Sequence, residues 1–178
     1  MIDFKKMTVS ATDAVKLAFG PSEFFFEPQV PKEVLDENKV IHALYGCEEC
    51  EEVELRLGQW TIRGKPDFTD GEKVVELKVV RPYSDKMRLL RTAIYQALIY
   101  AKAIGASTIE VTFHKWLSGE ADFWIFSVDE LNAFDFFTTL EANLNKLASL
   151  RTFKPPADIF YKPVAGKIVK TATVIKYE

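Results

Sequence analysis

The pattern of hydrophobic and polar positions predicts three consecutive β-strands near the middle of the chain. Residues 53–57 alternate apolar and charged side chains, and Gly58 separates them from a second strand-like run at residues 60–67. A third run covers residues 73–80 and follows the turn signal Asp70-Gly71. Because the connections are short, we expect these three strands to form an antiparallel meander.

Helical periodicity surrounds the predicted strands. Helices are expected at residues 12–19, 31–45, 84–104 and 128–150. Gly20-Pro21 ends the first helix, while Ser84 and Gly105 are the expected N-cap and C-terminal stop of the third. Further strands are expected at residues 108–114 and 123–126, with a hairpin around Gly166 in the tail. Without repeats or a linker, this order of elements indicates one α/β domain over residues 1–178.

Size and composition are typical of a cytoplasmic globular domain. The chain has 178 residues, of which 48% are hydrophobic, and this is enough for a proper core. No apolar h-region follows the charges of the first six residues, and no apolar run approaches the roughly 20 residues of a membrane span. We therefore expect a cytoplasmic protein with neither a secretory signal nor a membrane partner.

Charge is distributed unevenly along the chain, whose net charge is −3. Residues 23–54 are strongly acidic, whereas the segment from Arg63 to Lys102 is rich in lysine and arginine. A basic face on an acidic protein can bind phosphates. The simpler alternative is a solvated helix surface, and charge alone favours that alternative.

Two charged residues interrupt the apolar strand at residues 73–80. Glu76 and Lys78 share one side of this strand, because successive side chains alternate faces. Asp67 closes the preceding strand and would lie near Glu76 in a meander, where two carboxylates repel unless a proton or a cation lies between them. Mg²⁺ suits such a pair, and Lys78 would reach a metal-bound water or a phosphate. Taken alone, Glu76 and Lys78 also fit the polar face of an exposed strand.

The same residues resemble a known nuclease signature. Gly64-Lys65-Pro66-Asp67 followed by Glu76-Leu77-Lys78 is similar to the PD-(D/E)xK motif of the restriction-endonuclease-like nucleases, and Gln96-Ala97-Leu98-Ile99-Tyr100 is similar to the QxxxY motif of their RecB-like exonuclease branch. The resemblance implies a restriction-endonuclease-like core at about residues 38–126, with a mixed central sheet flanked by helices. The N-terminal helical segment and the C-terminal helix with its tail would pack on this core.

Within that branch the chain resembles the CRISPR-associated Cas-four nucleases. His42 falls where those proteins carry a helical metal-binding histidine, and residues 16–26 resemble their N-terminal segment with Gly20 in place of a cysteine. The resemblance implies Mg²⁺ or Mn²⁺ bound by His42, Asp67, Glu76 and the Leu77 carbonyl. A lone histidine on an apolar helix is otherwise a packed, hydrogen-bonded residue.

The cysteine content departs from those relatives. They hold an iron–sulfur cluster on four cysteines, whereas this chain has only Cys47 and Cys50, so no iron–sulfur cluster is expected. The spacing of these two cysteines is also typical of zinc sites, but no second Cys or His pair completes a set of four ligands. Thiols kept reduced, or a labile disulfide, are the expected states.

Together these features predict a metal-dependent deoxyribonuclease that acts on single-stranded DNA or DNA ends. Asp67, Glu76 and Lys78 would be catalytic, and Lys78 would position or activate the attacking water. The expected DNA contacts are Gln96, Tyr100, Arg81, Lys86, Arg88 and Arg91. Two alternatives stay open, namely a dimeric junction-resolving or restriction-type endonuclease and a non-catalytic DNA-binding or adaptor subunit. A homo-oligomer or a DNA-processing partner protein is compatible with each.

Overall fold

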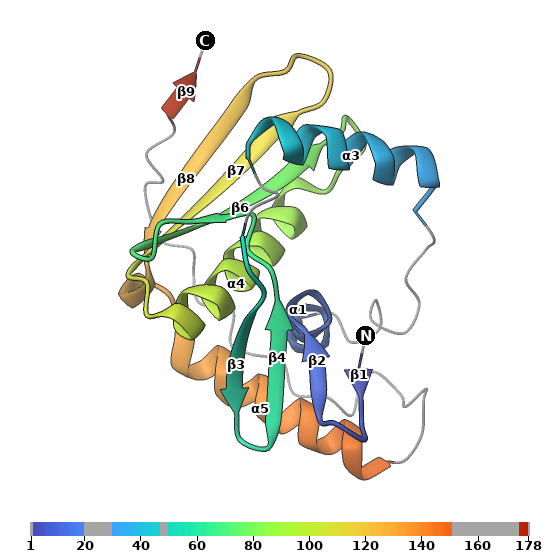
Figure 1. Ribbon diagram of the computed structural model, residues 1–178, viewed down its shortest axis with the longest axis vertical. Coiled ribbons are helices and arrows are strands. Elements are labelled where there is room, and N and C mark those ends of the chain that lie inside the picture. Colours follow the sequence, from blue (N-terminus) through green and yellow to red (C-terminus); the bar gives the residue numbers. More distant parts are fainter. Residues whose placement is uncertain (1, 20–29, 47–49, 151–174, 178) are drawn as a thin grey trace.

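Two separate β-sheets form the framework of the protein in a computed structural model that describes residues 2–19, 30–46, 50–150 and 175–177 (Figure 1). The first sheet has the strand order β1-β2-β4-β3 and the second has the order β5-β6-β7-β8-β9. The strands of the first are β1 (Ile2–Asp3), β2 (Thr8–Ser10), β3 (Val53–Leu57) and β4 (Trp60–Gly64). Those of the second are β5 (Phe68–Thr69), β6 (Lys73–Val80), β7 (Thr108–Lys115), β8 (Ala121–Ser127) and β9 (Ile175–Tyr177).

The expected antiparallel meander is wrong. β3 and β4 form an antiparallel hairpin, but β6 belongs to the other sheet, where it pairs with the two-residue strand β5. The second predicted strand therefore ends at Gly64 instead of Asp67. Pro66 explains the break, because proline has no N–H to donate to a ladder and is confined to strand ends and edges. The chain thus leaves one sheet after β4 and enters the other at β5.

The second sheet is mixed, as expected for the α/β class. β6 and β7 run parallel and are joined through helix α4 (Lys86–Ile104), whereas β7 and β8 are antiparallel. The N-cap of α4 is Asp85 instead of Ser84, since an Asp85 carboxylate oxygen accepts a hydrogen bond from the Arg88 N–H at 3.0 Å. Gly105 ends the helix in the left-handed conformation, with φ of 78°, which confirms the predicted stop.

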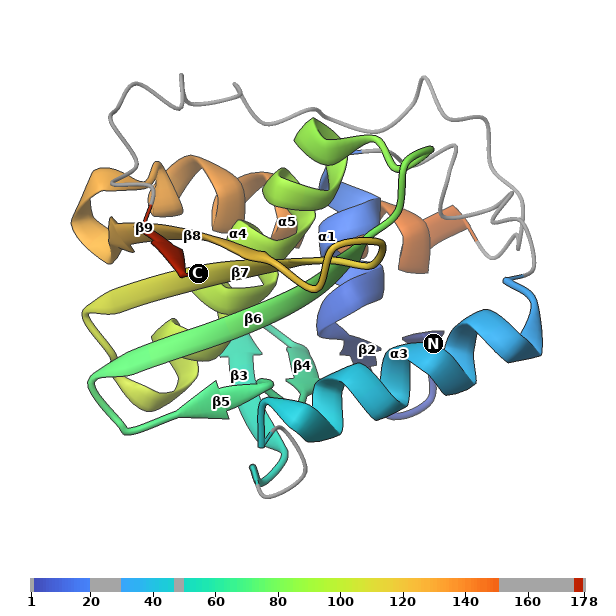
Figure 2. The same cartoon turned by 90° about the horizontal axis from the view of Figure 1, so that it is seen from above.

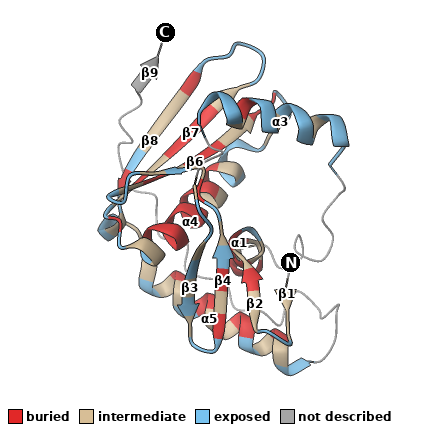
Figure 3. Cartoon of the chain, in the orientation of Figure 1, coloured by how far each residue is buried: buried red, intermediate tan, exposed pale blue. Residues whose placement is uncertain are grey.

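Helix α4 is the centre of the hydrophobic core. It packs against β6 and β7 of one sheet and β3 of the other, and its residues 93–101 are all buried. Helices α1 (Ala11–Phe19) and α5 (Ala133–Leu150) pack together beside it. The helix predicted at 128–150 is therefore two elements, a 3-10 turn at Val128–Glu130 and then α5. Figure 3 shows the buried positions concentrated on α4 and the strands that face it.

Helix α3 (Lys32–Leu44) differs from the other helices in its exposure. It lies beside β6 in both views (Figures 1 and 2), and Ile41 is its one buried residue. Pro31 occupies its N-cap position, close to the predicted start. None of the helices in the described ranges is long and apolar enough to cross a membrane. Gly20-Pro21, Cys47 and the hairpin expected around Gly166 lie outside the described residues.

Candidate active site

The short β5–β6 hairpin brings Asp67 and Glu76 together. Phe68 pairs with Val75, so Asp67, one residue before β5, lies alongside Glu76 and Leu77 of β6. One carboxylate oxygen of Asp67, Oδ2, accepts a hydrogen bond from the Leu77 N–H at 2.7 Å. The proximity predicted from the sequence is therefore present, although a different strand pairing produces it.

Lys78 and His42 contact the two carboxylates. Lys78 Nζ lies 2.6 Å from Glu76 Oε1, and His42 Nδ1 lies 2.9 Å from Asp67 Oδ1. His42 comes from the last turn of α3, so helix, loop and strand each contribute to the cluster. The structure thus brings together all four side chains that the sequence motifs singled out for the metal and the chemistry.

The hydrogen bonds leave one carboxylate oxygen of the cluster unused. Asp67 Oδ1, Asp67 Oδ2 and Glu76 Oε1 have the partners given above, whereas Glu76 Oε2 is buried and has no hydrogen-bond partner in the described part of the chain. Burying an unpartnered carboxylate oxygen is costly. A proton or a cation at this oxygen would remove that cost.

The electrostatics of the cluster favour a bound proton or cation. The pKa of Glu76 is raised to about 7, chiefly by burial and in addition by the nearby Asp67 charge, while Lys78 and His42 act in the opposite direction. Burial also raises the pKa of the Tyr100 phenol, with added contributions from the charges of Glu76 and Asp67. Tyr100 is therefore a neutral hydroxyl next to the two carboxylates.

Gln96 and Tyr100 lie one turn apart on α4 and are both buried. Gln96 Nε2 donates to Thr12 Oγ1 at 2.7 Å, whereas Gln96 Oε1 is buried without a partner among the described residues. Tyr100 lies against the end of β4, where a Cβ added to Gly64 would come within 2.6 Å of the Tyr100 hydroxyl. The QxxxY-like pair thus links α4 to α1 and β4 beside the carboxylates.

The four basic residues expected to contact DNA occupy different environments. Lys86 and Arg88 are exposed in the first turn of α4. The Arg91 guanidinium lies 5.0 Å from the centroid of the Phe19 ring. Arg81 is only 6% exposed and donates to Glu37 and Asn38 of α3. This buried position differs from the exposed phosphate contact that we expected, because tertiary packing of α3 covers the end of β6.

The donor set of the cluster fits a hard divalent cation of the Mg²⁺ type. The described residues contain no group of three or more His, Cys, Asp or Glu side chains arranged to hold a metal ion. Mg²⁺ does not require such a cage, since it is usually bound through one or two carboxylates and keeps several waters. Glu76 Oε2 offers the first carboxylate contact. Asp67 offers the second when one of its oxygens, which contact His42 and the Leu77 N–H, also contacts the metal.

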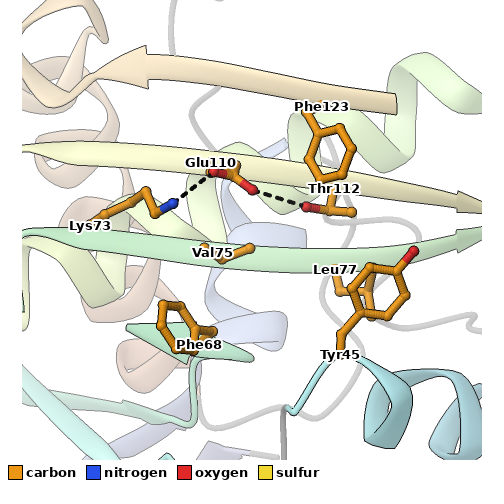
Figure 4. A pocket seen from close by; sticks show the side chains of 8 residues that line it. All are labelled: Tyr45, Phe68, Lys73, Val75, Leu77, Glu110, Thr112 and Phe123. Carbon is orange, nitrogen blue, oxygen red and sulfur yellow. Dashed lines mark hydrogen bonds and ion pairs between the residues drawn. The ribbon is translucent and has the colours of Figure 1, made fainter. Parts of the chain in front are cut away.

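A hollow of about 270 Å³ lies on the opposite face of β6 (Figure 4). Its β6 residues are Lys73, Val75 and Leu77, which alternate with Glu76 and Lys78 along the strand. Lys73 and Thr112 both contact Glu110 there, at 2.9 Å and 3.4 Å. The hollow is therefore separate from the carboxylate cluster, and the sequence patterns did not indicate it.

Some residues that support the cluster carried no sequence signal. Glu37, Asn38 and Thr12 are ordinary polar helix residues in the sequence, and only the tertiary structure places them against Arg81 and Gln96. The Cys50 thiol donates to the backbone carbonyl of Asp67 at 3.6 Å, so one of the two cysteines lies directly behind the site.

The fold and site define an α/β protein with a partly buried carboxylate–lysine cluster between a helix and a mixed sheet. No protein-family model matches the chain, and no curated protein matches it at a significant level. Among solved structures, the chain is similar to the crystal structure of SSO0001, with 18% sequence identity and a TM-score of 0.50. The similarity covers 84% of this chain and 79% of that chain. At this identity the likeness shows the fold alone.

Proposed function

We propose that the protein is a Mg²⁺- or Mn²⁺-dependent deoxyribonuclease that hydrolyses phosphodiester bonds in single-stranded DNA or at DNA ends. The observation that carries the proposal is the convergence of Asp67, Glu76, Lys78 and His42 in one cluster with an unpartnered buried oxygen. Purely structural ion pairs are better satisfied than this, because an orphaned buried oxygen destabilises the fold. The arrangement therefore supports a site that is completed by a ligand.

Asp67 and Glu76 would hold the metal, joined by the Leu77 carbonyl and His42, as the resemblance to the nuclease family implies. The bound metal would lower the pKa of water and polarise a phosphate. The Leu77 N–H and His42 fix the Asp67 carboxylate from two sides, which preorganises it toward Glu76. Lys78 Nζ lies on the same strand face and would orient the attacking water or stabilise negative charge developing on the phosphate.

The surroundings of the cluster suit a nucleic-acid strand. Gln96 and Tyr100 are each only 4% exposed, so they would support the cluster from inside the core instead of contacting a phosphate as the QxxxY resemblance led us to expect. Lys86 and Arg88 are exposed at the start of α4 and would bind the DNA backbone through charge. Arg81 is left out of this interface, since its guanidinium is buried against α3.

A substrate panel tests the activity and its direction together. Linear single strands labelled at either end, a closed single-stranded circle and a blunt duplex are incubated with the protein in Mn²⁺, Mg²⁺ or EDTA. We expect metal-dependent degradation of the linear strand from an end, with the circle left intact. Cutting of the circle would favour an endonuclease instead, and cleavage in EDTA would contradict a metal site.

One observation favours the non-catalytic alternative. Three of the four oxygens of Asp67 and Glu76 already have hydrogen-bond partners, so the cluster is nearly satisfied without a metal. If the protein is a non-catalytic DNA-binding or adaptor subunit, calorimetry will detect binding of DNA but no binding of Mn²⁺. Binding of one Mn²⁺ that depends on Glu76 would argue against this alternative.

A further inference from the structure

Helix α3 is held to the sheet by a small number of side-chain contacts. Ile41 is its one buried residue, and α3 contacts the rest of the described structure chiefly at β6. His42 Nδ1 reaches Asp67 from the last turn, and the Tyr45 hydroxyl at the C-cap lies 3.0 Å from His114 Nδ1. The third polar contact, in the middle of the helix, involves Arg81.

Arg81 makes a forked contact with α3. Its Nη2 lies 2.8 Å from Glu37 Oε2, and its Nη1 donates to Asn38 Oδ1 at 2.9 Å. The central carbon of the guanidinium, Cζ, lies over the Trp116 ring, 5.5 Å from its centroid. A planar guanidinium fixed by two acceptors and an aromatic ring has one defined orientation, which a lysine cannot reproduce. We call Arg81, Glu37 and Asn38 the Arg81 clasp.

The position of the clasp couples it to the carboxylate cluster. Arg81 directly follows β6, three residues after Lys78, so its backbone is fixed by the same strand that carries Glu76. Asn38 precedes His42 by four residues, which is one turn of helix and the same face. Because a helix is rigid over one turn, fixing Asn38 against the end of β6 also fixes the position of His42 relative to β6.

We propose that Arg81 is a positioning residue that places the His42 imidazole on Asp67 through α3, and that it does not bind DNA. The role of His42 toward a metal rests on the proposed function, whereas the clasp itself does not. The burial of Arg81 supports this assignment, because a side chain that is 6% exposed cannot reach a phosphate unless α3 moves away. The contacts to Glu37, Asn38 and Trp116 explain the orientation of the guanidinium without a bound phosphate.

The imidazole ¹⁵N and ¹³C resonances of labelled protein report the surroundings and hydrogen bonding of His42. The chain has two histidines, so His42→Ala assigns both. Arg81→Ala should shift the His42 ring resonances and increase hydrogen exchange across α3. The double variant Glu37→Ala/Asn38→Ala removes the same contacts from the side of α3. It should have the same effect while the buried Arg81 side chain stays in place. The matched control is Arg56→Ala on β3, which should change neither. Unchanged His42 resonances in both clasp variants would overturn the proposal.

A double-mutant cycle tests whether Arg81 acts through His42. In the presence of His42, Arg81→Ala should weaken Mn²⁺ binding by roughly 10- to 100-fold, the usual effect of removing a residue that orients a ligand. In a His42→Ala background the same change should have no further effect. Equal losses in both backgrounds would show that Arg81 acts independently of His42 and would overturn the proposal.

The two readouts separate failure of the clasp from failure of the proposed function. If the wild-type protein does not bind Mn²⁺, the metal site is refuted, but the His42 resonances still decide the role of Arg81. If the clasp variants leave His42 in place while Mn²⁺-dependent cleavage persists, the nuclease proposal stands and the clasp is refuted. Arg81→Lys adds a check, because lysine keeps the charge but cannot reproduce the forked contact, so the His42 resonances should shift as they do in Arg81→Ala. Unchanged resonances in Arg81→Lys would contradict the forked clasp.

Discussion

At the scale of single residues, the surroundings of Glu76 disfavour its charged form. It is buried, it faces another carboxylate, and one of its oxygens has no partner among the described residues. Lys78 offsets only part of this cost, because burial has the largest effect on the Glu76 pKa and raises it. Residues that destabilise the fold in this way are typical of functional sites, where a ligand completes the interactions.

The Glu76 pKa predicts how stability depends on pH. The pKa rises from 4.5 to about 7 on folding, so the native state binds more protons than the unfolded state between these values. The associated stabilisation is present below pH 4.5 and is lost as pH rises through 7, and it amounts to about 3 kcal/mol. The free energy of unfolding in urea is measured for the metal-free wild type and for Glu76→Gln. The difference between the two should therefore change between pH 4.5 and about pH 7. Glu54→Gln, at an exposed position of β3, is the control. A constant difference between wild type and Glu76→Gln would contradict the pKa.

Asp67 is expected to tolerate asparagine better than alanine. Its Oδ2 atom accepts the N–H of buried Leu77, and alanine would leave that N–H without an acceptor at a cost of about 1–3 kcal/mol. Asparagine keeps an acceptor oxygen and removes the repulsion from Glu76. Urea unfolding in EDTA should rank Asp67→Asn as the more stable variant, although both should lack metal-dependent cleavage. An alanine variant as stable as the asparagine variant would show that the Leu77 contact is unimportant.

At the scale of elements, the sequence predicted the helices and most strands but not how the strands pair. The period-2 pattern marks β3, β4 and β6 without stating which strands are neighbours, so the two-sheet division was missed. β1 and β2 are too short to give a periodic signal. Asp67, Glu76 and Lys78 were predicted together because a short connection keeps them close under either pairing. The Arg81 clasp depends on packing between segments more than 40 residues apart, and a single sequence contains no signal for it.

Close packing of β4 against α4 gives a prediction at the same scale. A Cβ on Gly64 would lie 2.6 Å from the Tyr100 hydroxyl and 3.1 Å from the Ala11 Cβ, and Tyr100 is buried. Gly64→Ala should therefore destabilise the protein by about 1–3 kcal/mol through overpacking and displace Tyr100 from the carboxylates. Thermal unfolding measures the cost. In a Tyr100→Leu background, which removes the clashing atoms, the same substitution should cost less. Equal costs in both backgrounds would place the strain elsewhere.

At the scale of the whole molecule, the proposed function requires DNA to approach from the start of α4. Lys86 and Arg88 are exposed there, whereas Arg81 and Arg91 pack against other elements. Replacing Lys86 or Arg88 with alanine should each reduce the slope of log K against log salt by roughly 0.7 for single-stranded DNA. Arg56→Ala on β3 should leave the slope unchanged. Unchanged slopes for both Lys86 and Arg88 would place the strand on another face.

The proposed function makes the Asp67–Glu76–Lys78 cluster a metal-dependent phosphodiesterase site. The most direct test is the single-turnover cleavage rate of a labelled single strand, measured at pH 8 over a Mn²⁺ titration for wild type and Glu76→Gln. We predict a saturating, Mn²⁺-dependent rate for wild type and at least a 100-fold lower rate for Glu76→Gln, or about 3 kcal/mol of lost transition-state stabilisation. Equal rates for the two proteins, or cleavage that does not respond to Mn²⁺, would contradict the claim.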